Sequence, residues 1–427
     1  MRKFVELNKD QKILKVALDV PVNKLFDYIS NDSKIKIGQY VKVPFGNRSL
    51  IGICCEISNK TQIESNKLKT IIHIDSEVIF DTLMLKLLNF VSDYYHHPIG
   101  QTIMSVVPSR IKKNSPSSRK KELLFKANKK LTKEIIENFP KRQLRLKNIA
   151  NAILEENLRQ RDLKKLASNS GECIKKLEQL GLISSEVYIP KTKNAKSIKP
   201  TLNEDQKNVI DCINQCKTFK PWLIHGVTAS GKTEIYINLI TKLLLDKPSQ
   251  VLMLIPEINL TPQLEARFQD RFYDKKIVIL HSYLSNLDRL DNWREAKAGK
   301  ADIVIGTRLA VFTPMPNLKM IIIDEEHDAS FKQSEGLKYH ARDVAMIRAK
   351  NSNIPIVMGS ATPSLETWYK AINAQQNFQY FKLNKRAVDD SRLPIIKTIQ
   401  VNEKTKLQIS KQVIDEIEKR IHKKEQT

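Results

Sequence analysis

Between residues 201 and 383, short continuous apolar runs alternate with longer segments whose apolar residues recur at helical spacing. Apolar runs bounded by polar residues are typical of buried strands, and helical stretches between such strands indicate a parallel sheet covered by helices. The expected strands are 222–224, 251–255, 277–280, 303–305, 320–323 and 356–358. This part of the chain is therefore predicted to be an α/β lobe with a parallel sheet.

Residues 12–108 have a different pattern, in which apolar and polar positions alternate over short runs. Strands are expected at 13–20, 40–46 and 49–53 because turn-forming residues separate these runs, and a helix is expected at 82–95. The pattern predicts a small β-rich domain.

From about residue 130 to residue 190 the pattern becomes helical. Segments 162–167 and 170–183 predict two helices across a tight turn, and 187–189 predicts a strand after them, which is the outline of a winged helix. A helical hairpin without DNA contact fits the same pattern.

Two polar segments with basic residues, Pro and Ser divide the chain, which is therefore predicted to be a multidomain α/β protein. The expected order is a β-rich domain at 1–109, a basic linker at 110–125, a winged-helix-like domain at 126–190, a linker at 191–200, the α/β lobe at 201–385 and a last segment at 386–427.

The charge of the chain favours a polyanionic partner. Lys and Arg number 72 against 47 Asp and Glu, which gives a formal net charge of +25 and an isoelectric point near 9.6. A composition rich in Lys, Asn and Ile also follows from base bias in a genome, so only part of this excess is assigned to function. No apolar stretch approaches the ~20 residues of a transmembrane helix, and the first residues have no signal-peptide pattern. We expect a cytoplasmic protein that binds nucleic acid and no membrane.

The five cysteines argue against disulfides, because they are odd in number and show no C-x-x-C spacing. Cys212 and Cys216 are four residues apart on an expected helix, without a nearby set of His or Cys partners. We expect reduced thiols and no zinc site in this chain.

The segment GVTASGKT at 226–233 fits the phosphate-binding pattern G-x-x-x-x-G-K-T and lies between an expected strand and an expected helix. Small residues let backbone N–H groups turn toward phosphates, Lys232 reaches the outer phosphates, and Thr233 offers a hydroxyl to Mg²⁺. An ordinary Gly-rich turn is the alternative. The expected nucleotide-binding residues are Gly226, Val227, Thr228, Ala229, Ser230, Gly231, Lys232 and Thr233.

Polar residues also follow two of the other expected strands, at the sheet edge where ligands bind in open α/β sheets. Asp324 is expected to hold the hydration shell of Mg²⁺, and Glu325 to orient the attacking water, so both join Lys232 as candidate catalytic residues. Ser360 and Thr362 are expected to sense the γ-phosphate. A solvated acidic loop and a plain turn are the respective alternatives.

These motifs, in this order, resemble motifs I, II and III of superfamily 2 helicases. More narrowly, the chain resembles the PriA family of replication-restart helicases over most of residues 12–400. The segments that carry this similarity are 26–28, 43–46, 51–53, 94–100, 255–263, 306–308 and 324–343. An RNA helicase or a chromatin-type translocase is disfavoured because the similarity includes the amino-terminal domain.

The resemblance implies an ATP-dependent 3′-to-5′ DNA helicase of the primosome, which uses Mg²⁺ and recognises stalled replication forks. It implies a DNA 3′-end-binding domain at 1–109 and a RecA-like helicase lobe at 201–385. Forked DNA, single-stranded DNA, other primosome proteins and single-strand-binding proteins are the implied partners.

The resemblance also assigns roles to individual residues. Gln206 is assigned to adenine, since an amide can donate and accept at once. Single-strand contacts are assigned to Pro256, Thr261, Thr307 and Arg308, and the pocket for a free 3′ end to Phe26, Asp27, Gly46 and Lys69. Coupling of DNA to the ATP site is assigned to Phe331, Tyr339, Arg342, Ser360 and Thr362. Leu337 stands where the family usually has a further ring, and a core aromatic is the alternative for Phe26.

The sequence departs from the family at its carboxyl end. The family's second helicase lobe, with its zinc-binding cysteine cluster and arginine finger, is not seen in the 65 residues after Thr362. We expect residues 386–427 to be the start of a truncated second lobe, and expect weak ATP binding, little ATP turnover and no strand separation by this chain alone. The alternative function is then a catalytically weak fork-DNA-binding module that recruits replication proteins.

Overall fold

The computed structural model describes residues 11–32, 34–64, 67–112, 123–140, 143–159, 162–163, 170–187, 200–227, 229–246, 248–259, 261–384, 398 and 410–423. Thr228 of the phosphate-binding motif, most of both expected linkers and most of the expected segment 386–427 lie outside these residues.

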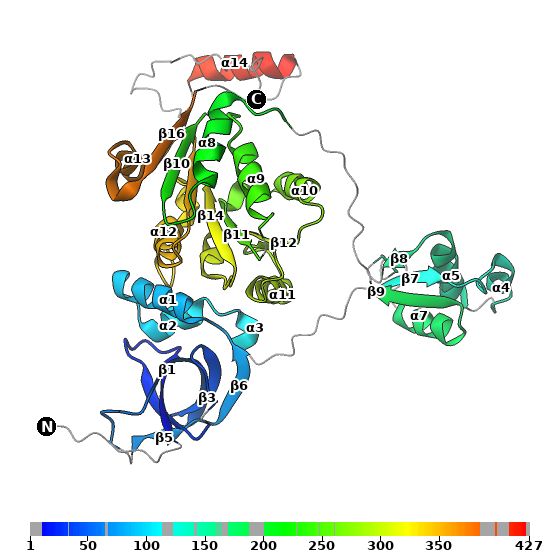
Figure 1. The fold of residues 1–427 in the computed structure, drawn as a ribbon. Helices are drawn as coiled ribbons and strands as arrows, with labels where there is room; N and C mark the ends of the chain where they lie inside the picture. The colour runs from blue at the N-terminus through cyan, green and yellow to red at the C-terminus, as the bar shows by residue number, and fades with distance from the viewer. Residues whose placement is uncertain are drawn as a thin grey trace. The chain divides into compact units, whose positions relative to one another are not determined.

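The amino-terminal domain is a curled six-stranded sheet with helices at one end (Figure 1). Its elements are β1 (Lys12–Leu18), β2 (Phe26–Ser30), β3 (Gln39–Phe45), β4 (Arg48–Ser58), β5 (Lys69–Thr70), β6 (His73–Val78), α1 (Thr82–Tyr94), α2 (Ile99–Ser105) and α3 (Ser109–Lys112). The strand order is β5-β2-β1-β4-β3-β6. The predicted strands β1, β3 and β4 and the helix α1 are confirmed. The sequence pattern does not predict β2, β5 or β6, whose residues are mostly half-buried or exposed.

Residues 123–187 form a small domain with its own hydrophobic core. Its elements are β7 (Leu123–Ala127), α4 (Lys133–Glu137), α5 (Leu144–Glu155), β8 (Leu158–Arg159), α7 (Ser170–Gln179) and β9 (Ile183–Val187). The antiparallel order β8-β7-β9 beside these helices confirms the predicted winged-helix fold. Two details differ. The described part of the last strand is Ile183–Val187, where the prediction has the end of a helix, and β7 begins inside the expected linker, because Leu123 pairs with Val187 across the sheet. Residues 164–167 of the first predicted helix and 188–189 of the predicted strand lie outside the described residues.

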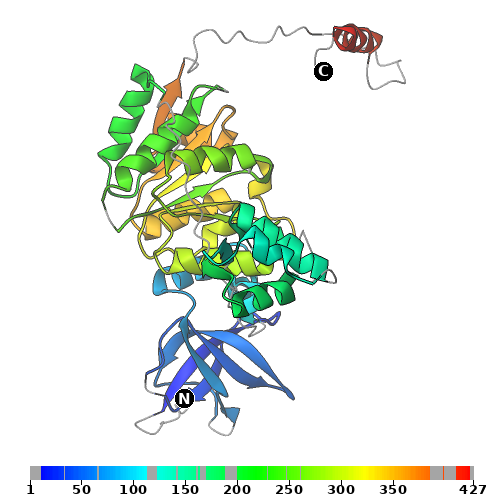
Figure 2. The ribbon, with the colours of Figure 1, turned by 90° about the vertical axis from the view of Figure 1, so that its right-hand side faces the viewer.

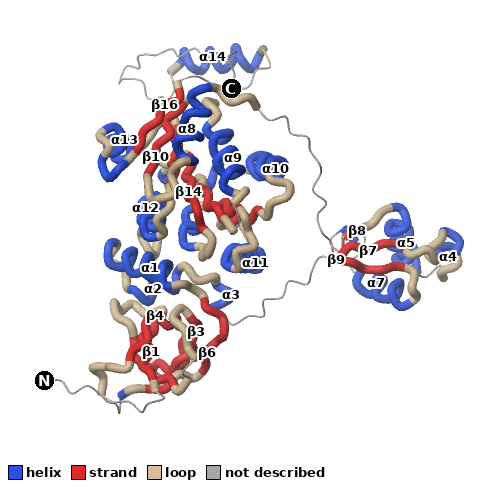
Figure 3. Tube along the Cα trace, in the orientation of Figure 1, coloured by secondary structure: helices blue, strands red, loops and turns tan. Residues whose placement is uncertain are grey.

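The third domain is built on a seven-stranded parallel sheet, whose strands are red in Figure 3. The predicted parallel sheet is confirmed, and the structure adds the strand β16 to the six that the sequence predicts. Its strands are β10 (Pro221–Gly226), β11 (Gln250–Leu254), β12 (Ile277–Leu280), β13 (Ile303–Gly306), β14 (Leu318–Asp324), β15 (Ile356–Ser360) and β16 (Gln379–Leu383), in the order β12-β13-β11-β14-β15-β10-β16. Its α-helices are α8 (Glu204–Asn214), α9 (Lys232–Leu243), α10 (Pro262–Arg271), α11 (Asn286–Lys297), α12 (Ala341–Asn351) and α13 (Leu365–Ile372).

Both faces of this sheet are buried. Val251 and Met253 of β11 belong to the core that α8, α9 and α10 cover, whereas Leu252 and Leu254 belong to the core under α11 and α12. Successive strand residues point to opposite faces, so burial on both faces requires the continuous apolar runs seen in the sequence.

Helices α1 and α2 connect the amino-terminal domain to the lobe, and Figures 1 and 2 show them between the curled sheet and the lobe. Residues of α1 and α12 share one hydrophobic core. Glu77 of β6 forms ion pairs with Arg294 at 3.0 Å and Lys297 at 2.8 Å, both on α11. The Tyr95 hydroxyl accepts a hydrogen bond from the backbone N–H of His340 at 3.2 Å. The two domains therefore meet through packed side chains, ion pairs and a hydrogen bond, although the small domain at 123–187 separates them in the sequence.

Residues 388–427 are separate from the rest of the chain as a second unit. In this unit the structure describes one helix, α14 (Lys411–His422). Within the described ranges, no helix is long and apolar enough to cross a membrane.

Candidate nucleotide site and nucleic-acid interface

The phosphate-binding motif forms the turn between β10 and α9. Gly231 has φ 85° and Ala229 has φ 64°, so the chain passes twice through the left-handed region, which glycine enters at little cost. Among the described residues, no side chain caps the first turn of α9. Backbone N–H groups at that end are therefore available to an anion, and the helix dipole favours a phosphate there.

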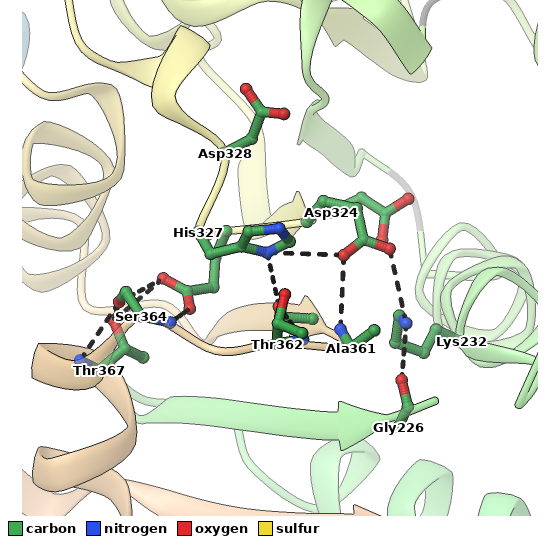
Figure 4. A network of polar contacts seen from close by, with 12 residues as sticks. Gly226, Lys232, Asp324, His327, Asp328, Ala361, Thr362, Ser364 and Thr367 are labelled. Atoms are coloured by element: carbon green, nitrogen blue, oxygen red, sulfur yellow. Dashed lines mark hydrogen bonds and ion pairs between the residues drawn. The ribbon is translucent and has the colours of Figure 1, made fainter. Parts of the chain in front are cut away.

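Lys232 lies between Gly226 of the turn and the acidic motif, as Figure 4 shows. Its Nζ donates a hydrogen bond to the carbonyl oxygen of Gly226 at 2.8 Å and lies 3.5 Å from Oε1 of Glu325. The residue is buried, so its charge is held in place by these two oxygens. The ammonium group is thus positioned between the turn and the acidic motif, where outer phosphates would lie.

Asp324 ends β14 and is fixed by Tyr236 of α9. The buried Tyr236 hydroxyl donates a hydrogen bond to Oδ1 of Asp324 at 3.1 Å. Gly359 of β15 makes room for this contact, because a Cβ at that position would lie 1.6 Å from the Tyr236 hydroxyl oxygen. A carboxylate at the end of this strand and the Thr233 hydroxyl of the motif are oxygen groups of the kind that Mg²⁺ prefers as ligands.

The pKa of Asp324 makes the site sensitive to pH. Burial, and then the charge of Glu325, raise this pKa to about 6, against the opposing effects of Tyr236 and Lys232. The carboxyl group is therefore protonated below about pH 6 and ionised above it. Since Mg²⁺ requires the ionised form, Mg²⁺-dependent nucleotide binding should be present above this pH and be lost as the pH falls through it.

Tyr236→Phe should move that loss to higher pH by about one unit, because the carboxylate loses a donor. Mg²⁺-dependent binding of a fluorescent ATP analogue, measured from about pH 5 to about pH 8, checks this. Tyr273→Phe, at a half-exposed tyrosine on the same lobe, is the control. An unchanged pH midpoint in Tyr236→Phe would contradict the assigned hydrogen bond.

Side chains link the carboxyl ends of β14 and β15. Glu325 directly follows β14, and Ser360 is the last residue of β15. Glu325 has φ 47°, a strained conformation for a residue with a side chain, and its Oε2 accepts from the Ala361 N–H at 3.4 Å. His327 Nδ1 lies 2.7 Å from Oγ of Ser360, which also accepts from the N–H of Thr362 at 3.0 Å (Figure 4). A shift at Glu325 can thus reach Ser360 and Thr362 through direct contacts.

Glu326 is a fully buried carboxylate with a complete set of donors. Its oxygens accept from the Arg342 guanidinium at 3.0 Å, the N–H and hydroxyl of Ser364 at 2.7 and 3.0 Å, and the Thr367 hydroxyl at 3.0 Å. These contacts join the acidic motif to α12 and α13. Arg342, which the resemblance assigns to coupling, is therefore a structural partner of the acidic motif.

Gln206 lies at the start of α8, against the phosphate-binding turn. Its Oε1 accepts from the N–H of Asn203 at 3.0 Å, and its Nε2 donates to the carbonyl oxygen of Ser230 at 2.9 Å. A side-chain amide has two donor hydrogens and two acceptor lone pairs, so these bonds use half of its capacity.

The segments assigned to single-stranded DNA lie at the carboxyl ends of β11 and β13. Thr261 caps α10 by accepting from the N–H of Leu264 at 3.3 Å, and the Arg308 guanidinium donates to the Ser330 carbonyl oxygen at 3.1 Å. A cavity of about 440 Å³ is lined by Thr307, Arg308 and Glu257 together with residues 105–109 of the amino-terminal domain. Both domains therefore contribute to one cavity beside the assigned DNA contacts.

The structure changes the interpretation of the loop at 328–342. Phe331 and Tyr339 are 0% and 4% exposed, and Tyr339 packs edge-on against Phe312 with ring centroids 5.0 Å apart. Leu337 is buried as well. Both rings lie in this core and not at the surface, so the coupling assigned to Phe331 and Tyr339 would act through packing and not through a base stacked on either ring. The sequence shows only that the loop has aromatic residues, whereas burial depends on α12 and the strands beneath.

The four residues assigned to a DNA 3′ end come together at one end of the curled sheet. The rings of Phe26 and Phe45 are 5.5 Å apart and edge-on, and the half-buried Phe26 packs against a hydrophobic core of this domain, so the alternative of a core aromatic stays open. Asp27 accepts a hydrogen bond from the Thr61 hydroxyl at 2.6 Å. Lys69 is exposed beside β2, since it pairs with Tyr28. Gly46 follows Phe45 directly, with φ 58° and no atom within 4 Å of a Cβ built there.

Sequence reasoning missed four residues that hold the site together. Tyr236, Gly359 and Glu326 are described above, and Glu234 of α9 is the fourth. Glu234 is buried and forms an ion pair with Arg271 of α10 at 2.7 Å. A charged or polar residue at an expected core position, such as Glu234 directly after the GKT triplet, is the signal that could have identified Tyr236, Glu326 and Glu234.

Comparisons with known proteins agree with this arrangement. Residues 15–108 match the family model described as 3′DNA-binding domain (3′BD), of the PriA type, and residues 203–371 match that of DEAD/DEAH box helicases. The Replication restart protein PriA of Haemophilus influenzae is 36% identical over 400 residues, which cover 90% of this chain and 53% of that protein. That of Chlamydia pneumoniae is 32% identical, with 99% and 58% covered. This chain belongs to the PriA family.

The PriA relative from Synechocystis is 41% identical over a shorter stretch of 254 residues. The chain spans about half the length of the first two PriA relatives. Among solved structures, RecG bound to a three-way DNA junction matches 44% of the chain at 20% identity with a TM-score of 0.34, too low to support an argument. PriA membership makes the amino-terminal sheet a 3′ DNA-binding domain and the α/β lobe a helicase domain.

Proposed function

We propose that this chain acts in replication restart as an ATP-dependent 3′-to-5′ DNA helicase that recognises stalled forks. The observation that carries the proposal is the direct packing of a 3′ DNA-binding domain against a helicase lobe in which Lys232 contacts Glu325 and the neighbouring Asp324 is held by Tyr236. A domain that holds a DNA end and a lobe that responds to nucleotide are the two parts that such an activity needs.

In the nucleotide site, the N–H groups of the phosphate-binding turn would hold the phosphates and Lys232 the outermost ones. Thr233 and Asp324 would hold Mg²⁺, which neutralises charge on the phosphates when bound. Glu325 would orient the attacking water, and its strained backbone supports such a role, since strain of ~1–3 kcal/mol is commonly kept at functional positions. The unused half of the Gln206 amide would meet the adenine edge.

DNA would meet the chain at two places. At the 3′ end, Phe26 would stack on the terminal base, Asp27 would accept from the 3′-hydroxyl, Gly46 would admit the sugar, and the exposed Lys69 would approach a phosphate. Along the lobe, Pro256, Thr261, Thr307 and Arg308 would hold the single strand without reading its sequence. Contacts from Glu325 through Ser360 to Thr362, and from Glu326 through Arg342, would connect the two. Other primosome proteins and single-strand-binding proteins are the partners that family membership supports.

A second candidate is a fork-DNA-binding module that recruits replication proteins with little ATP turnover. The observation that favours it is that the four 3′-end residues lie entirely within β2, β5 and the turn after β3, apart from the nucleotide site.

Unwinding of partial duplexes with a 3′ or a 5′ single-stranded tail tests the proposal. If this chain is itself a 3′-to-5′ helicase, strand separation depends on ATP, occurs on the 3′-tailed substrate and not on the 5′-tailed one, and is lost with a non-hydrolysable ATP analogue. Such unwinding would overturn the expectation from the sequence that this chain alone separates no strands. Forks whose leading strand ends in a 3′-phosphate should bind more weakly than forks with a free 3′-hydroxyl, because Asp27 then meets a like charge. Tight fork binding without unwinding would support the second candidate, and equal binding of both fork ends would contradict 3′-end recognition.

A further inference from the structure

We infer that Tyr283 is a stacking platform for an unpaired base of single-stranded DNA that lies along the carboxyl edge of the lobe sheet. The inference rests on the proposed function, in which DNA contacts Thr307 and Arg308. Tyr283 is 83% exposed, so core packing does not account for the ring. Aromatic rings exposed beside a backbone-binding groove are the usual platforms for bases of a single strand.

The position of Tyr283 places it beside the proposed DNA contacts. It lies in the loop after β12, and the carbonyl oxygen of Leu280 at the end of β12 accepts from the N–H of Thr307 at 3.1 Å. Its neighbour Ser282 lines the same cavity as Thr307 and Arg308. A strand that contacts these two residues therefore runs past the Tyr283 loop.

The loop itself is held in place. The Arg289 guanidinium donates to the carbonyl oxygens of Ser282 at 2.9 Å and His281 at 3.4 Å, and the Ser282 hydroxyl hydrogen-bonds to Glu257. The N–H of Tyr283 donates to Nδ1 of His281 at 3.1 Å. A loop that is already ordered presents the ring at a low entropy cost on binding.

The usual aromatic loop does not offer its rings here. Phe331 and Tyr339 are buried, and each would have to leave the core to meet a base. Exposing a buried aromatic side chain costs about as much free energy as its burial contributes, and one stacked base returns no more than that. Tyr283 needs no such rearrangement.

The test measures binding of the full chain to labelled oligo(dT) by fluorescence anisotropy. Tyr283→Ala should weaken binding about 5- to 150-fold, and Tyr283→Phe, which keeps the ring, should stay within about twofold of the unmodified chain. The dependence of affinity on salt should not change in either variant, because the ring neutralises no phosphate. An abasic oligonucleotide of the same length should bind the unmodified chain and Tyr283→Ala equally.

The matched control is Tyr273→Ala. Tyr273 is 53% exposed and follows α10, near the amino end of β12 and so at the opposite edge of the sheet. The inference is overturned if Tyr283→Ala binds oligo(dT) as tightly as Tyr273→Ala, or if it loses affinity for the abasic strand to the same extent. An unmodified chain that binds neither oligonucleotide would instead overturn the proposed function. Thermal melting of each variant checks that the exposed substitutions leave the fold intact.

Discussion

Glu325→Gln should lower DNA-stimulated ATP hydrolysis by about 10²–10⁴-fold while leaving nucleotide binding almost unchanged. A positioned acid or base contributes this much to a rate, and glutamine keeps the size of the side chain but cannot accept a proton. The carboxylate lies 3.5 Å from Lys232 and 3.4 Å from the N–H of Ala361, so it is held where a water attacking the outer phosphate would stand. Phosphate release with forked DNA measures the rate, and a fluorescent ATP analogue measures binding.

Lys232→Ala is the paired variant. It should lose nucleotide binding together with hydrolysis, because Lys232 is proposed to hold the outer phosphates in the ground state as well as during the reaction. If Glu325→Gln hydrolyses ATP as fast as the unmodified chain, the water-orienting role belongs to another residue. If Glu325→Gln loses binding as Lys232→Ala does, the carboxylate acts mainly on the position of Lys232.

Glu326→Ala should destabilise the helicase lobe by about 3–5 kcal/mol. The substitution leaves the Arg342 guanidinium without its buried partner, and removing one member of a buried ion pair costs this much. The Ser364 and Thr367 groups lose their acceptor as well. Urea denaturation followed by tryptophan fluorescence is selective for the lobe, because Trp222, Trp293 and Trp368, the three tryptophans of the chain, all lie in it.

The control for this prediction is Asp343→Ala. Asp343 also contacts Arg342, at 3.3 Å, but its side chain is half exposed, and a pair of this kind contributes about 0–1 kcal/mol. Glu326→Gln should fall between the two, since it keeps acceptor atoms and volume but loses the charge. A midpoint of unfolding in Glu326→Ala close to that of Asp343→Ala would show that the network does not stabilise the lobe.

The sequence predicted the helicase lobe well where its strands are buried on both faces. The core residues of β11 and β14 form continuous apolar runs. Short runs of this kind, with helical segments between them, indicate buried strands and few other structures. The sequence did not predict β16, which lies at the edge of the sheet and whose residues are mostly half-buried. The sequence also did not predict β2 and β5 of the amino-terminal domain. These segments are strands because β2 pairs with β1 and β5 pairs with β2.

The candidate site divides in the same way. The phosphate-binding turn and the pair Asp324 and Glu325 are local in sequence, so their spacing alone indicated them. Tyr236 and Gly359 are not, because their contact with Asp324 depends on β15 lying between β14 and β10. The sequence did not indicate the burial of Phe331 and Tyr339 either, since whether a ring is buried depends on segments far away in the chain.

By itself, the sequence determined the order of domains, the parallel sheet, the phosphate-binding turn and the acidic motif, because each depends on residues close together along the chain. Only the tertiary structure decided which side chains hold the motifs in place and which rings remain exposed. Burial and hydrogen bonding between distant segments are set by the packing of whole elements. Glu326 inside its network and Tyr283 at the edge of the sheet both owe their roles to that packing.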